Sequence, residues 1–242
     1  MNLLAVMYHR ARAGSDGNSP LMLDAHFAYL ARHCACVLPG EILAGDRLNV
    51  CLTFDDATSD FHSVVFPLLQ KHGLRAVLAV SPGFICGQED SFSAAQVKVG
   101  GEIRGAQMDR RLHCTWEELA VLVASGRVAI AAHGLSHVRL DRGDVDLQIE
   151  VLVPQRILSA RLGQPVDSFV FPFGRFSPVA LRTVKQHYRH AFRIGGAINR
   201  NWSGSVLYRV NGDGLTGPDS LFSAGRIAAA RARFYWNRLR GR

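Results

Sequence analysis

The sequence predicts an α/β fold in which about seven parallel strands form a barrel or near-barrel. The first observation behind this prediction is the order of elements: short apolar runs alternate with amphipathic helical patterns along the 242 residues. This order is typical of parallel strands joined by helical crossovers. The second observation is that no glycine-rich phosphate loop follows the first strand, so an open dinucleotide-binding sheet has no support. Barrels of this length commonly fold as one unit.

The expected strands are mostly continuous apolar runs, as in strands that are covered on both faces. They are Leu3–Tyr8, Asn49–Phe54, Ala76–Val80, Val128–Ala132, Ser168–Phe171, Ala191–Ile194 and Val206–Val210. Residues 83–113 are polar and rich in glycine, and we expect a long loop there.

Helical patterns occupy the segments between these strands and the end of the chain. Asp24 is the expected N-cap of the first helix, and Thr115 with Glu118 predicts a capping box on the third. Pro154 interrupts the fourth helix, and Pro178 is expected at the first position of the fifth. The expected helices are Asp24–Cys36, Asp60–His72, Thr115–Ser125, Asp144–Leu162, Ser177–Tyr188 and about Pro218–Leu239.

Composition indicates a chain that folds without the need for stabilising disulfide bonds or structural metal ions. It is 48% hydrophobic and 20% charged, and a chain of this size buries roughly 70–75% of its unfolded surface. No segment approaches the ~20 apolar residues of a membrane span. The first residues lack the basic start of a signal peptide, and the five cysteines are scattered and odd in number. We therefore expect free thiols and a cytoplasmic protein.

The positive charge is concentrated at the C-terminus. From Ser220 to the end there are six arginines and no acidic residue, so this segment carries +6 of the net +8. The remaining residues carry only +2, and a nucleic-acid partner is not expected for this nearly neutral body. We divide the chain into a barrel, residues 1–217, and a basic C-terminal helix, residues 218–242, packed on or extending from the same domain.

The sequence is compatible with three roles for the last helix. At ~100° per residue its apolar side chains share one sector, flanked by arginines on both sides. One interpretation is a helix that packs this sector on the barrel, with solvated arginines. A second is peripheral contact of Arg226–Arg242 with an anionic membrane, on its inner face, because Tyr and Trp beside basic residues are typical of interfacial helices. An RNA-binding tail is a third. The sector contains Ala228, Ala232, Tyr235, Trp236 and Leu239.

Polar residues follow the expected strands at the ends where barrel chemistry is usually found. The carboxyl ends of parallel strands meet at one face of a barrel, and enzymes of this architecture place their sites there. These positions include His9, Asp55 with Asp56, His133 with His137, the segment 172–175, and Asn211 with Asp213. We expect their side chains to converge on one site.

Two motifs indicate hydrolytic metal chemistry. Asp55 and Asp56 place two carboxylates after a buried strand, and such a pair is relieved by a bound cation or by a raised pKa on one member. One of them can bind a metal while the other acts as general base. His133 and His137 lie four residues apart, on one side of a helical turn. Two imidazoles and a carboxylate leave an open position for water, and they suit zinc, cobalt or nickel better than magnesium.

Together these segments resemble the polysaccharide deacetylase family, the NodB homology domain or carbohydrate esterase family 4. The segment 53–56, Thr-Phe-Asp-Asp, is similar to its first motif, and 133–137, His-Gly-Leu-Ser-His, to its second. Phe171-Pro172-Phe173-Gly174 resembles the third motif in its Tyr-Pro-Tyr-Gly form. Further similar segments, 7–10, 72–76 and 115–119, extend the resemblance over most of residues 3–210 in the right order.

The resemblance implies a distorted (β/α) barrel that removes acetyl groups from N-acetylated sugars. It implies that Asp56, His133 and His137 bind one divalent metal ion, with zinc preferred, and that Asp55 is the general base. It also implies that the segment Pro172, Phe173 and Gly174 contacts substrate, with a backbone N–H near Phe173 stabilising the oxyanion.

Two departures from the family pattern change the expected site. The arginine that often precedes the third motif is replaced by Val170, and we expect Arg175 to orient the base instead. The late Leu-x-His motif that supplies the general acid is missing, since no histidine follows His190. His9 is the expected substitute, with a packed structural histidine as the alternative. Trp202 is expected either to stack on a sugar or to anchor its loop.

The expected function is therefore metal-dependent N-deacetylation of an N-acetylhexosamine in a cell-surface glycan precursor, lipid-linked or related to lipopolysaccharide. Two alternatives remain. One is a related barrel hydrolase that cleaves a small non-sugar amide or cyclic imide. The other is a catalytically weak glycan-binding protein, favoured by the missing late histidine and by Val170.

Overall fold

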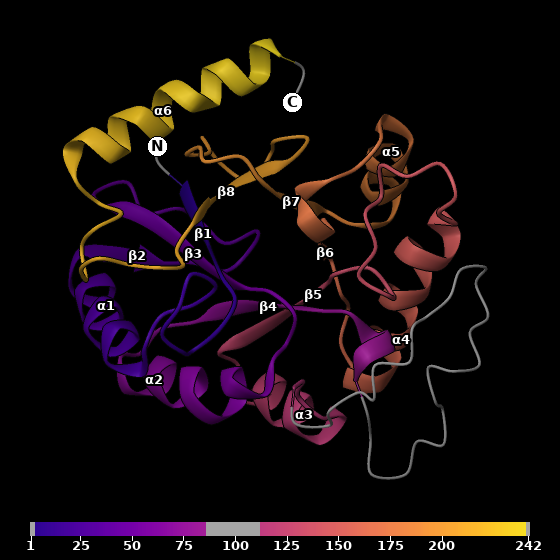
Figure 1. Cartoon of the computed structure of the whole chain (residues 1–242), viewed down its shortest axis with the longest axis horizontal. Helices are drawn as coiled ribbons and strands as arrows, with labels where there is room; N and C mark the ends of the chain where they lie inside the picture. Colours follow the sequence, from indigo (N-terminus) through magenta and orange to yellow (C-terminus); the bar gives the residue numbers. More distant parts are fainter. Residues whose placement is uncertain (1–2, 86–111, 241–242) are drawn as a thin grey trace.

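The computed structural model of the chain describes residues 3–85 and 112–240. Most of the loop expected at residues 83–113 lies outside these ranges. Within them, seven parallel strands close into a barrel, ringed by helices α1 to α5 (Figure 1). The barrel strands are β1 (Leu3–Tyr8), β3 (Leu48–Phe54), β4 (Ala76–Val80), β5 (Val128–Ala132), β6 (Ser168–Val170), β7 (His190–Ile194) and β8 (Leu207–Asn211).

Closure follows from the pairing of β1 with both β3 and β8. Leu3–Tyr8 pairs with Asn49–Phe54 over six residues, and Ala5–Met7 pairs with Arg209–Asn211 on the other side. The remaining strands follow in the order β3, β4, β5, β6, β7 and β8. The joint between β5 and β6 is a single register pair, Ala132 with Phe169, which makes the barrel distorted. The expected fold class is confirmed.

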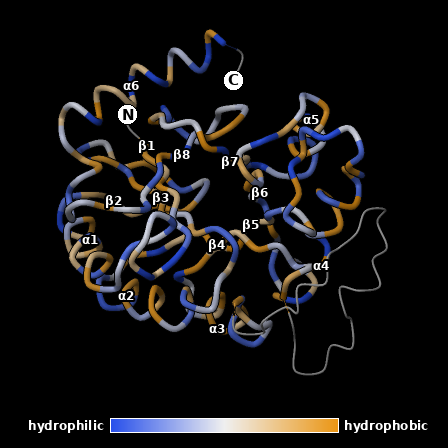
Figure 2. Tube along the Cα trace, viewed as in Figure 1, coloured by the Kyte–Doolittle hydropathy of each residue, from blue (hydrophilic) through white to orange (hydrophobic). Residues whose placement is uncertain are grey.

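Alternating side chains divide the core into two parts, because successive residues of a strand point to opposite faces. A small cluster fills the barrel interior, including Ala5, Cys51 and Phe192. A larger cluster lies between the strands and the surrounding helices, including Tyr8 and Phe54. Hydrophobic residues accordingly concentrate in the strands and hydrophilic ones in the outer loops (Figure 2).

The helices are α1 (Pro20–His33), α2 (Phe66–Lys71), α3 (Trp116–Ala124), α4 (Val153–Leu162), α5 (Pro178–His187) and α6 (Ala224–Leu239). A wider π-helical turn precedes α2 at Phe61–Val65 and another precedes α4 at Gln148–Leu152. The expected capping box of Thr115 and Glu118 on α3 is present. Pro178 stands in the first turn of α5, as expected.

The first helix differs from its expected limits at both ends. Ser19 caps it, accepting the Met22 N–H at 3.2 Å, while Asp24 lies inside the helix and bonds to the His72 ring at 2.6 Å. The helix ends at His33 because Cys34–Cys36 forms an additional strand, β2, which pairs with the start of β3. The sequence alone does not distinguish helix from strand for Cys34–Cys36, because a short apolar run does not show whether it pairs with another strand.

The last helix begins later than expected, at Ala224, where the Ser223 side chain caps it. Residues 217–222 form turns instead, with the Phe222 N–H bonded to the Asp219 carbonyl at 2.8 Å. Helix α6 lies at the rim of the molecule beside β1 and β8 (Figure 1). The Ile198 N–H bonds to the Ala230 carbonyl at 3.2 Å and the Asn237 amide to the Gly195 carbonyl at 3.0 Å, which fixes α6 on the barrel.

Candidate active site

The carboxyl ends of the strands surround a cavity of about 560 Å³. A volume of this size is typical of small-molecule sites. Its lining includes residues at or just after the ends of β1, β3, β5 and β8, so the predicted convergence on one barrel face is present for these four strand ends. Among them are His9, Asp56, His137, Asn211 and Asp213.

Asp56, His133 and His137 form a three-residue cluster in which one ligand atom from each lies within 4.8 Å of the others. The His133 Nδ1 bonds to the Val170 carbonyl at 2.8 Å, so this nitrogen carries the proton and Nε2 is left as an acceptor. Nε2 of His133 lies 3.7 Å from Asp56 Oδ1, and Nε2 of His137 lies 3.4 Å from the same oxygen. This donor set fits a divalent cation.

The protonation of His137 suits a ligand. Burial, and then the neighbouring His133, lower the pKa of His137 to about 4. The ring is therefore neutral near pH 7, with a lone pair available for a metal. Phe173 packs against it, with ring centroids 4.6 Å apart.

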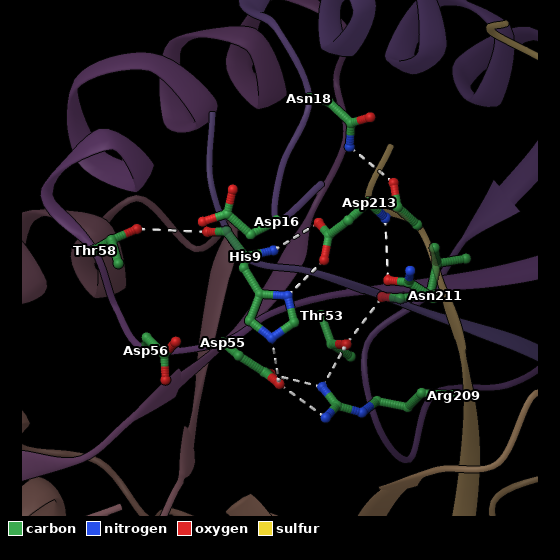
Figure 3. Close-up of polar contacts among 12 residues, drawn as sticks. His9, Asp16, Asn18, Thr53, Asp55, Asp56, Thr58, Arg209, Asn211 and Asp213 are labelled. Atoms are coloured by element: carbon green, nitrogen blue, oxygen red, sulfur yellow. Dashed lines mark hydrogen bonds and ion pairs between the residues drawn. The ribbon is translucent and has the colours of Figure 1, made fainter. Parts of the chain in front are cut away.

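Asp55 is buried beside this cluster and is held by an arginine. Nη1 and Nη2 of Arg209 bond to its two carboxylate oxygens at 2.6 and 2.9 Å (Figure 3). Arg209 Nη1 also bonds to the Thr53 hydroxyl at 3.1 Å. Burial alone would raise the pKa of Asp55, but the charge of Arg209, together with His133, lowers it to about 2. The carboxylate is thus ionised throughout the usual pH range.

His9 lies on the other side of Asp55 and is fixed by Asp213. The His9 Nδ1 is 2.6 Å from Asp213 Oδ2, and the His9 backbone N–H donates to Oδ1 at 3.0 Å. The Nε2 is 3.8 Å from Asp55 Oδ2 (Figure 3). The hydrogen bond to Asp213 raises the pKa of His9, against the effect of burial. His9 therefore presents Nε2 to the site with a carboxylate behind it.

Backbone conformations are unusual at this barrel face. Among the residues that the structure describes, four other than glycine have positive φ: Asp56 at 70°, Ala57 at 47°, His137 at 54° and Phe173 at 56°. All four follow barrel strands and lie at or next to the site. Such conformations cost of order 1–3 kcal/mol each and cluster at functional sites.

Two of the predicted site residues are not brought to the cluster. Arg175 is exposed, and its backbone carbonyl accepts a hydrogen bond from Leu140; the arginine that contacts Asp55 is Arg209. The Trp202 indole donates to the Glu41 carbonyl at 2.8 Å, and its ring packs on His190 at the start of β7. Trp202 thus anchors its loop at the amino end of the barrel, opposite the site.

The third motif lies at the rim of the site. Pro172–Gly174 forms a short 3₁₀ turn after β6. Pro172 and Gly174 are buried, and Phe173 is 56% exposed against the His137 ring. The close packing of Gly174 on Ile194, where a Cβ would lie 3.1 Å from the Ile194 Cβ, explains the glycine.

Sequence reasoning missed Arg209 and the pairing of His9 with Asp213. The signal for Arg209 was present: it interrupts the apolar run Leu207–Val210 at a position that points into the barrel. A charged side chain there requires a buried partner of opposite charge. Asp213 was recognised only as a polar residue at a strand end, because its partner follows β1, more than two hundred residues earlier.

Comparison with known proteins identifies the family. Residues 44–192 match the sequence model of the family described as polysaccharide deacetylase. Poly-beta-1,6-N-acetyl-D-glucosamine N-deacetylase of Escherichia coli (strain K12) is 34% identical over 84 residues, which are 35% of this chain and only 11% of that protein. The provisionally named polysaccharide deacetylase YxkH of Bacillus subtilis (strain 168) is 21% identical over 90% of this chain and 74% of its own.

Solved structures agree on the fold. Streptococcus pyogenes deacetylase PplD, solved in complex with acetate, superposes with a TM-score of 0.74 at 18% identity, covering 91% of this chain and 96% of that one. Because the family match covers more than half of the residues, the chain belongs to the polysaccharide deacetylase family.

Proposed function

We propose that the protein is a metal-dependent N-deacetylase that hydrolyses the acetamide of an N-acetylhexosamine in a surface-glycan precursor, lipid-linked or related to lipopolysaccharide. The observation that carries the proposal is the cluster of Asp56, His133 and His137, with their ligand atoms within 4.8 Å of one another, beside the buried Asp55. The Escherichia coli relative, named for an N-acetyl-D-glucosamine polymer, supports the sugar class.

Asp56, His133 and His137 would hold the cation, zinc in the first instance and cobalt or nickel as alternatives. Two imidazole nitrogens, one carboxylate oxygen and an open position are typical of hydrolytic zinc sites. When bound, the ion polarises the amide carbonyl and lowers the pKa of water at the site. The fixed Nδ1 proton of His133 and the neutral ring of His137 support this assignment.

Asp55 is the proposed general base, accepting a proton from the attacking water at Oδ2. Arg209 fixes the plane of this carboxylate through both oxygens, the role expected of Arg175. With a pKa of about 2, Asp55 is a weak base, so the water must already be acidified for the transfer to be effective. Asp55 would therefore act effectively as the base only if a bound cation lowered the pKa of the attacking water.

His9 is the proposed general acid. Its Nδ1 is occupied by Asp213, so the proton that it donates to the leaving sugar nitrogen comes from Nε2, the atom nearest Asp55. The raised pKa keeps more of the ring protonated near neutrality. The backbone N–H of Phe173, with Pro172 and Gly174 shaping its turn, is the proposed additional donor to the oxyanion. Amide and water thus become free amine and acetate.

We also propose that residues 226–242 contact an anionic membrane, on the cytoplasmic face. Ile227, Ala230, Phe234 and Asn237 face the barrel. At ~100° per residue, the apolar sector points to the opposite side of the helix. Tyr235, Trp236 and Leu239 in it are 56%, 51% and 83% exposed.

The charge of this helix supports an anionic partner. Arginines flank the exposed sector on both sides, and Arg240 lies 4.6 Å over the Trp236 ring. Each basic residue near an anionic surface contributes ~1 kcal/mol. No described helix is both long and apolar enough to cross a bilayer, and the free thiols of the described cysteines fit a reducing compartment. An enzyme bound to the membrane surface in this way would lie close to lipid-linked sugar substrates.

An acetate-release screen tests the proposed activity. The zinc-loaded protein is offered N-acetylhexosamines, their oligomers and lipid-linked forms, in parallel with small N-acetyl amides. Cyclic imides are assayed separately by loss of the imide absorbance, because their ring opening releases no acetate. We expect acetate only from the sugars. Turnover confined to the small amides or imides would favour the alternative hydrolase, and sugar binding without turnover would favour a glycan-binding protein.

A further inference from the structure

Glu150 is a buried carboxylate that the mechanism above does not use. It lies in the π-helical turn before α4 and is 6% exposed. A carboxylate in such a place requires hydrogen-bond donors, because an isolated buried charge is costly. Its carboxylate accepts hydrogen bonds from Leu135 and Ser136, in the short segment between His133 and His137.

The contacts of Glu150 span that segment. Oε2 accepts the backbone N–H of Leu135 at 2.9 Å and that of Ser136 at 3.1 Å. Oε1 accepts the Ser136 hydroxyl at 2.5 Å. Hydrogen bonds to an ionised acceptor are roughly twice as strong as neutral ones. A single side chain therefore holds two consecutive peptide units between the two histidines.

The neighbouring backbone shows how closely the carboxylate fits. Gly134 has φ of +74°, and a Cβ there would lie 3.0 Å from Glu150 Oε2. The Leu135 carbonyl accepts the Gly83 N–H at 3.0 Å, and the His133 carbonyl accepts the Ser81 hydroxyl at 2.7 Å. The segment is thus fixed on the β4 side by Ser81 and Gly83, and on the α4 side by Glu150.

His137 depends most on this anchoring. His133 is bonded at its backbone to Val80 and at its ring to Val170. His137 instead follows the anchored peptides with φ of 54°, a conformation unfavourable for a residue other than glycine. Its Nε2 nevertheless lies 3.4 Å from Asp56 Oδ1. The peptide units that lead into this conformation are the ones bonded to Glu150.

We infer that Glu150 is a positioning residue, which holds the 134–136 backbone so that His137 presents Nε2 to the same point as Asp56 and His133. The inference rests on the proposed metal dependence and adds a residue that acts through the backbone rather than by touching the ion. Partners behind metal ligands typically contribute 10–100-fold to metal affinity.

The test measures zinc affinity by chelator competition, the visible spectrum of the cobalt-loaded protein and the melting temperature of the metal-free protein. Glu150→Ala removes all three acceptor contacts, and we expect a 10–100-fold loss of zinc affinity with an altered cobalt spectrum. Glu150→Gln keeps an amide oxygen for the backbone N–H groups, and we expect a smaller loss. If the alanine variant does not fold, the glutamine variant and Glu150→Asp carry the comparison with wild type.

Glu41→Ala is the matched control. Glu41 also accepts a backbone N–H, from Leu38 at 2.8 Å, but lies at the amino end of the barrel beside Trp202. We expect it to lower the melting temperature without changing zinc affinity. Unchanged affinity and an unchanged cobalt spectrum in every folded Glu150 variant would overturn the inference alone. A wild-type protein that binds no divalent metal would overturn the proposed function and this inference together.

Discussion

Arg209 crosses from β8 to bind both carboxylate oxygens of Asp55, which directly follows β3. The two strands are not neighbours, since β1 lies between them in the barrel. The contact distances are 2.6 and 2.9 Å, and both side chains are buried. The orientation of the proposed base is therefore set across the barrel interior, rather than from β6, where Val170 replaces the arginine that is frequent in the family.

Replacing Arg209 with methionine leaves Asp55 buried without its partner. Breaking one side of a buried ion pair costs roughly 3–5 kcal/mol, and we expect a loss of unfolding free energy of this size. Chemical denaturation measures it. The double variant Arg209→Met with Asp55→Asn should recover part of the loss, because it no longer buries a lone charge. Additive losses in the double variant would show that the two residues are not coupled.

The pair of His9 and Asp213 predicts a pH effect on catalysis. The hydrogen bond to Asp213 raises the pKa of His9, and the proposed acid works only when protonated, so activity should fall as pH rises through that pKa. Asp213→Asn removes the effect and should move this alkaline limb to lower pH. The profile of kcat/KM against pH measures the shift. An alkaline limb that stays in place would exclude His9 as the titrating acid.

The raised pKa of His9 also predicts that the free energy of unfolding depends on pH. A histidine whose folded pKa lies above its unfolded value of about 6.5 stabilises the protein below that pH, and the contribution is lost as pH rises through the folded pKa. Wild type should therefore lose more unfolding free energy than His9→Gln over this rise in pH. Denaturation curves of the metal-free proteins at several pH values measure the difference. Parallel losses in both would contradict the pKa direction assigned to His9.

Metal binding should depend on His133 far more than on a histidine elsewhere. His133→Ala removes one of the three proposed ligands, and we expect zinc affinity to fall by at least about tenfold, in line with the effect of losing even outer partners of a metal site. His187→Ala, on α5, is the control. Elemental analysis and chelator competition provide the measurement. Equal metal content in the two variants would place the cation elsewhere.

The exposed side of α6 predicts binding to anionic vesicles. Leu239→Ser should weaken sedimentation with phosphatidylglycerol vesicles, and removal of residues 226–242 should abolish it at low salt, because apolar burial and arginine charge both contribute. Leu21→Ser, on α1, is the control, since Leu21 is also 83% exposed. Equal vesicle binding by the full and shortened proteins would contradict the membrane contact.

The strands and the cluster of Asp56, His133 and His137 were predictable from the sequence because their signals are local. Continuous apolar runs mark β1, β4 and β5 with the limits that the structure has. Asp56, His133 and His137 lie in short motifs at strand ends. The remainder depends on partners far apart in the chain: Arg209 with Asp55, and His9 with Asp213. Barrel closure creates these pairs. The charge of Arg209 within an apolar run marks one member as unusual, but no local pattern identifies the partner of either residue.

The central claim, cation-dependent deacetylation with Asp55 as base, is tested most directly by acetate release from an N-acetylhexosamine substrate. The proteins to compare are wild type and Asp55→Asn, each metal-free and with one equivalent of zinc. We predict rapid acetate release only from zinc-loaded wild type, with the zinc-loaded variant slower by roughly 10²–10⁴-fold while it still binds zinc. Full activity of the variant, or of metal-free wild type, would contradict the account.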